Sequence, residues 1–484
     1  MSIFFTKKTS ILAAALLVVL KANPAWGHAF GGRYDLPLPL WLILIGAASA
    51  VVLSFCIIAL FLKHRGEQEE GLAFDLLKLS GLGWLGFEPT LNIMRAISVS
   101  IFALVLCAGF IGDPGTLKNL APTFVWVIWW NGMAFASALG GNLWALVNPW
   151  KILFVWFEGR IGGIGPFFIY PEMLSRWPAV ILFGIFAWLE LISELGEDPR
   201  SLARIIGAYS ALTWSGMALF GRRVWLRNAD PFSGVFDLLA RFAPSIGKAG
   251  CWELRLPAVG LLNKRPVSIS GVCFVLLLLT TVTFDGILET PLWAGLMEWV
   301  SYSWPLHSFP TALQNSSFDP IVFFKVIALV ALPCVFIAVY LAFCHAIAAF
   351  GGGYISTIDV AGYFILSLVP IAIAYHLSHY LSYMLIAGQN IIPLVSDPFG
   401  FGWDLFGTVG YQVDIGIVTA KQVWYVGVTA IVIGHVVAVY VAHIMAVRIF
   451  AERQAALKSQ VPMLVLMIGY TMVSLWVLSQ PIVG

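Results

Sequence analysis

Long apolar runs separated by short polar segments fill most of the chain. Ten of these runs are close to the ~20 residues that a membrane-spanning helix requires. The pattern therefore predicts an all-α protein, a polytopic membrane helical bundle of about ten transmembrane helices. The predicted spans cover residues 38–62, 93–112, 119–140, 177–195, 202–221, 267–287, 320–347, 360–383, 422–447 and 461–480.

The first 27 residues have the pattern of a cleaved secretory signal peptide. Lys7 and Lys8 precede an apolar core, and Ala25-Trp26-Gly27 forms a small-x-small cleavage site. Cleavage there makes His28 the mature N-terminus. A terminal histidine offers its α-amine and its imidazole to one metal ion, as in copper-dependent polysaccharide monooxygenases. An uncleaved first helix, or a terminal histidine without a role, is the alternative.

The basic residues provide a separate test of the predicted topology. A cleaved signal leaves the N-terminus outside, so the first span runs inward. Eighteen Lys and Arg residues then lie on the cytoplasmic side and five on the periplasmic side, as the positive-inside rule requires. We expect a multi-pass protein of the bacterial inner (cytoplasmic) membrane with a periplasmic N-terminus.

Composition narrows the function classes further. The chain of 484 residues is 60% hydrophobic and 11% charged, with a formal net charge of +2, which gives no reason to expect nucleic acid as a partner. None of the six cysteines forms a C-x-x-C motif, so neither a disulfide framework nor a thiolate metal site is predicted.

Residues 28–484 are predicted to form a single transmembrane helical domain with three long loops. The cytoplasmic loop 222–266 contains an amphipathic pattern at 235–242 that is typical of an interfacial helix. The periplasmic loops 288–319 and 384–421 are too apolar for solvated tails. We expect both to pack over the outer mouth of the bundle.

Ionisable side chains at the outer ends of two spans form the candidate site. His376 and His379 stand three residues apart, which places them on one face of a helix. Glu190 and Glu194 lie one turn apart at the outer end of another span, and His28 is on the same side of the membrane. Imidazole and carboxylate ligands suit a divalent transition metal, zinc or copper. The sequence predicts such a metal site at His28, Glu190, Glu194, His376 and His379.

Three other interpretations of these residues stay open. Each histidine could simply bond a neighbouring tyrosine or a backbone carbonyl. His376 or His379 could share a haem with His435, although the estimated depths differ by two or more turns. Lys325 and helix interruptions such as Pro370 could line the pathway of a metal- or solute-handling membrane protein.

Four runs along the mature chain stand out as motifs: HAFGGRYDLPLPLW at 28–41, GNLWALVNPW at 141–150, AYHLSH at 374–379 and DPFGFGWDLFG at 397–407. Together they resemble bacterial multi-span membrane proteins labelled fenitrothion hydrolase. The resemblance implies a phosphoric triester hydrolase, or a subunit of one, that cleaves the P–O–aryl bond of a small apolar organophosphorus substrate. Such a substrate would partition into the lipid bilayer and approach laterally, and a second membrane subunit or a homo-oligomer is a possible partner. A metal-bound water could supply the nucleophile.

Overall fold

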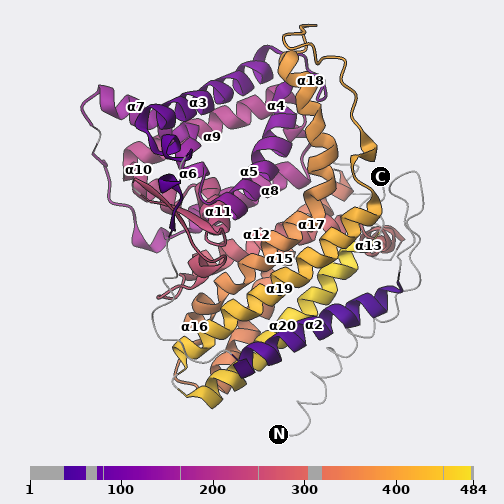
Figure 1. The fold of residues 1–484 in the computed structure, drawn as a ribbon. Coiled ribbons are helices and arrows are strands. Elements are labelled where there is room, and N and C mark those ends of the chain that lie inside the picture. The colour runs from indigo at the N-terminus through magenta and orange to yellow at the C-terminus, as the bar shows by residue number, and fades with distance from the viewer. Residues whose placement is uncertain are drawn as a thin grey trace.

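The structure is a computed structural model that describes residues 38–61, 74–79, 81–163, 165–248, 250–302, 319–450 and 452–480. The predicted signal peptide and His28 lie outside the described residues. The described chain is mostly helical and has very few strand residues, which confirms the all-α membrane bundle (Figure 1).

Within the described residues, seven helices are long and apolar enough to cross a membrane. All seven coincide with predicted spans, because each is an uninterrupted apolar run with few charges. They are α2 (Leu40–Phe61), α3 (Glu88–Ile111), α12 (Ile269–Leu288), α15 (Pro320–Phe350), the continuous segment from α16 (Thr357–Phe364) through α17 (Val369–Ala387) to α18 (Ile391–Ser396), α19 (Ala420–Ile449) and α20 (Arg453–Leu478).

The other three predicted spans also fall on helices. Residues 119–140 form α4 (Leu120–Pro122), a π-helical segment η3 (Thr123–Asn131) and α5 (Gly132–Gly140). α8 (Trp177–Leu191) rises only about 22 Å, less than the ~30 Å apolar core of a bilayer. α9 (Pro199–Phe220) is longer but carries arginines. α4 and α9 pack against α3, whereas α8 packs against α12.

α12 is the central helix of the fold. Its side chains from Ser270 to Thr283 are all buried, because α8 and α15 pack on it from two sides. A helix that is apolar all round is one that other helices surround. α17 packs along α19, and α2 lies beside α19 and α20 although it is the first described helix (Figure 1).

The loop 222–266 forms two short helices and most of a small sheet. α10 (Arg222–Asn228) is followed by α11 (Pro231–Ala240). α11 overlaps the amphipathic pattern at 235–242, for which the sequence predicts a helix. The apolar residues of α11, including Val235 and Phe236, are turned into the protein and wholly buried.

The small sheet was not predicted from the sequence. The strands β1 (Phe74–Asp75), β2 (Ser245–Lys248) and β3 (Cys251–Leu254) pair antiparallel in the order β1-β3-β2. The backbone pairing of β1 with β3 connects the segment after α2 to the loop between α9 and α12.

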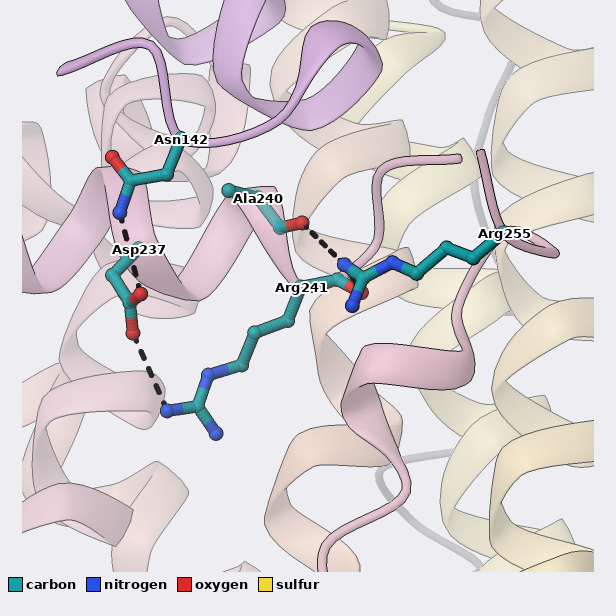
Figure 2. A network of polar contacts seen from close by, with 5 residues as sticks. All are labelled: Asn142, Asp237, Ala240, Arg241 and Arg255. Atoms are coloured by element: carbon teal, nitrogen blue, oxygen red, sulfur yellow. Dashed lines mark hydrogen bonds and ion pairs between the residues drawn. The ribbon is translucent and has the colours of Figure 1, made fainter. Parts of the chain in front are cut away.

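Arg255 closes the C-terminal end of α11 (Figure 2). Its guanidinium donates hydrogen bonds to the carbonyl oxygens of Ala240 at 2.9 Å, Arg241 at 3.1 Å and Ala243 at 3.1 Å. Carbonyls at a helix end have no partner within the helix, and a cation there also complements the helix dipole. Arg241 itself points away, toward Asp237.

Replacing Arg255 by Ala is expected to lower the free energy of unfolding by about 2–3 kcal/mol, because the change leaves half-buried carbonyls without their charged donor. Equilibrium unfolding in mixed micelles measures the loss. Arg241→Ala is the matched control: its ion pair with Asp237 is exposed, so its removal should cost less than about 1 kcal/mol. Equal losses in the two variants would contradict the capping role of Arg255.

Candidate functional site

A half-buried carboxylate, Asp285, is the centre of a polar cluster between α12 and α17. Its Oδ2 atom lies 2.9 Å from Nε2 of His379 and accepts a hydrogen bond of 2.8 Å from the Tyr380 hydroxyl. The His379 side chain is 18% exposed and that of Asp285 22% exposed. The two side chains are therefore bonded to each other and only partly exposed.

Small residues allow the helices that carry the cluster to approach closely. A Cβ atom at Gly286 would lie 2.5 Å from Cγ1 of Val477 and 3.0 Å from the Tyr375 hydroxyl oxygen. Gly286 directly follows Asp285, so the close contact of α12 with α17 and α20 occurs at the site itself. Close approach through small residues is the common way in which membrane helices pack.

His376 lies one turn before His379 and lines a separate small cavity of about 20 Å³. Glu190, Tyr380, Trp130 and Thr281 also line this cavity. Its volume suffices for about one water molecule. Nε2 of His376 is buried and has no hydrogen-bond partner in the part of the chain that the structure describes. The cavity thus places the unpaired Nε2 atom of His376 next to the Asp285 cluster, with which it shares Tyr380.

Other charged groups act on Asp285. Glu190 and Lys325 both interact with it electrostatically, the first from α8 and the second from α15. Glu289 lies just beyond the end of α12, where burial and then the charge of Asp285 raise its pKa. Four elements therefore bring ionisable side chains to one region of the bundle.

The structure brings together three of the five residues in the predicted site. His376 and His379 lie on α17, and Glu190 on α8 shares the small cavity with His376. Glu194 begins the short 3₁₀ helix η5 (Glu194–Gly196) after α8 and is exposed. His28 lies outside the described residues. Within the described ranges, no group of three or more His, Cys, Asp or Glu side chains is arranged to hold a metal ion.

His435, the second histidine of the haem interpretation, is wholly buried in α19. Its Nδ1 atom lies 2.8 Å from the carbonyl oxygen of Ile431, and its ring packs near Tyr470. Its Nε2 atom is buried and has no hydrogen-bond partner among the described residues.

Sequence reasoning missed Asp285, although a signal for it was present. It is the single acidic residue in the run 267–287, and an ionisable residue inside a membrane span is a functional candidate by default. Tyr380 was considered only as a hydrogen-bond partner for the histidines.

Comparison of the chain with protein-family models, with curated proteins and with solved structures finds no match.

Proposed function

We propose that the protein is a membrane-embedded hydrolase of small apolar aryl phosphotriesters, with His379 and Asp285 as its general-base pair. The observation that carries the proposal is the 2.9 Å contact between these side chains at a partly exposed position within an apolar helix bundle. The substrate class comes from the resemblance of the four sequence runs. The bilayer concentrates such compounds at the level of the site.

In the proposed step, His379 takes a proton from water while the water oxygen attacks phosphorus. The P–O–aryl bond breaks, and the aryl oxide leaves with its electron pair. Nε2 of His379 faces Asp285, so Nδ1 is the proton acceptor; within the described chain it forms no hydrogen bond. Asp285 fixes the orientation of the ring and stabilises the imidazolium that forms, as carboxylates do in other His-dependent hydrolases.

A zinc or copper ion remains a prediction that the mechanism does not use. His376 and Glu190 line one cavity, but the described residues supply no third ligand there. Metal analysis of the purified protein tests the prediction directly. If one equivalent is bound and His376→Ala loses it, His376 is a ligand.

We further place the protein in the bacterial inner membrane with a periplasmic N-terminus. The excess of Lys and Arg in alternate loops supports this orientation. Single cysteines introduced into the two loops test this orientation. A thiol reagent that does not cross the inner membrane should label a cysteine in the loop 384–421 in intact cells, but not one in the loop 222–266.

Purified protein in lipid nanodiscs is expected to release a nitrophenol from an aryl phosphotriester, and empty nanodiscs are the control. In ¹⁸O-labelled water, the phosphodiester product should gain one ¹⁸O atom and the phenol none, because attack at phosphorus breaks the P–O bond. Label in the phenol, or no release above empty nanodiscs, would refute the proposal.

Transport of a solute is the second candidate, and the interaction of Lys325 with Asp285 favours it. Opposite charges on different membrane helices are typical of ion and proton pathways. Uptake of an apolar phosphate ester into proteoliposomes without its hydrolysis would support transport instead.

A further inference from the structure

A second cavity, larger and apolar, lies among the helices that precede α12. Its volume is about 830 Å³, and it is bounded by α3, η3, α8, α9 and the beginning of α7 (Pro149–Arg160). Side chains such as Ile97, Phe102, Leu182 and Leu212 line it. The volume is in the range of ligand pockets in proteins. Neither Asp285 nor His379 contributes to it.

The cavity follows the axis of the helices. On α3 its lining runs from Met94 to Val105, and on the neighbouring α9 from Leu202 to Leu212. At ~1.5 Å per residue these stretches are about 15 Å long, half the ~30 Å apolar core of a bilayer. The cavity is therefore about as long as one acyl chain in one leaflet.

Two basic residues directly follow lining residues of this cavity in the sequence. Arg95 follows Met94 on α3, and Lys151 follows the lining residue Trp150 on α7. Arg222 also interacts with Lys151. Burial, followed by the charges of Arg222 and Arg95, lowers the pKa of Lys151. Lys151 is thus close enough to Arg222 and to Arg95 to be repelled by each of them.

Nearby carboxylates neutralise only part of this charge. Arg222 pairs with Glu158 at 2.9 Å and Arg95 with the exposed Glu88 at 3.4 Å. Lys151 donates to the carbonyl oxygen of Ala145 at 2.5 Å and forms no ion pair with any carboxylate in the described ranges. A net positive charge remains beside an apolar cavity.

We propose that this cavity is a binding site for an anionic phospholipid. An acyl chain fills the apolar volume, and the headgroup phosphate lies against Lys151 and Arg95. A neutral aryl compound or a zwitterionic lipid would fill the same volume but would gain nothing from the surplus charge. This proposal is independent of the hydrolase proposal, because the two sites share no residue.

Native mass spectrometry of protein released from nanodiscs of equal phosphatidylglycerol and phosphatidylcholine tests the proposal. Wild-type protein should retain phosphatidylglycerol selectively. Each of Lys151→Gln and Arg95→Gln should lower this selectivity about fivefold, since one basic group near a membrane contributes ~1 kcal/mol toward an anionic lipid. Lys264→Gln, an exposed basic residue that is not among the groups acting on Lys151, is the matched control and should retain wild-type selectivity.

A variant that fills the cavity tests its apolar part separately. Ile97→Trp should lower the retention of both lipids, and the fold tolerates the change because Ile97 is 53% exposed. Equal retention of the two lipids by the wild type, or unchanged selectivity in Lys151→Gln, would overturn the proposal.

Discussion

An Asp285→Asn variant is expected to hydrolyse an aryl phosphotriester about 10³-fold more slowly than the wild type. The amide keeps the size of the side chain but removes the charge that orients His379 and stabilises its protonated form. His379→Ala should reduce the rate to a similar extent, because it removes the proton acceptor itself. Initial rates of nitrophenol release in nanodiscs measure both effects.

The double variant, Asp285→Asn with His379→Ala, tests whether the two residues act together in one step or independently of each other. If Asp285 acts through His379, the double variant is no slower than His379→Ala alone. Glu194→Gln is the control, because Glu194 is exposed and lies outside the cluster. A rate within tenfold of wild type for Asp285→Asn would exclude the pair as the general base.

A Gly434→Leu variant is expected to lose about 3 kcal/mol or more of stability. A Cβ atom at this position would lie 2.6 Å from the Cβ atom of Ala374 and 2.8 Å from the carbonyl oxygen of Pro370. Neither atom can move unless α17 shifts away from α19, and overpacking of this kind costs ~1–3 kcal/mol or more. Since His376 and His379 follow Ala374 on α17, the same shift should also reduce hydrolysis.

Thermal unfolding in detergent, followed by tryptophan fluorescence, measures the loss for Gly434→Leu. Gly469→Leu on α20 is the matched control, since a Cβ atom there meets no other atom within 4 Å. A melting temperature for Gly434→Leu close to that of the control would show that the α17–α19 contact is looser than described.

The helices were predictable because each depends on its own residues. An apolar run of about 20 residues, bounded by polar segments, determines a membrane helix without reference to the rest of the chain. The same local reasoning located His376 and His379 on one face of α17. It could not find the partner of His379, because Asp285 lies 94 residues away and only the packing of α12 against α17 joins them.

The strands and the π-helical segment were not predictable for a related reason. β1 has two residues, too few for a periodic pattern, and its partner β3 follows about 180 residues later. The run 119–140 is mostly apolar, and its few polar residues, such as Thr123 and Asn131, form no pattern that distinguishes η3 from an ordinary α-helix. η3 packs against α17, a helix about 250 residues further along the chain, and a local sequence pattern cannot show such a contact.

The position of α2 has a consequence for how the chain is made. α2 packs on α19 and α20, and Leu44 lies in one apolar cluster with Ile431 and Leu475. At ~5–20 residues per second, a ribosome needs roughly 20–80 s to extend the chain from the end of α2 to the end of α20. For that interval α2 is in the lipid without its partners. The protein therefore reaches its final arrangement only after synthesis is complete, and a chain truncated before α19 would leave α2 open to membrane quality-control proteases.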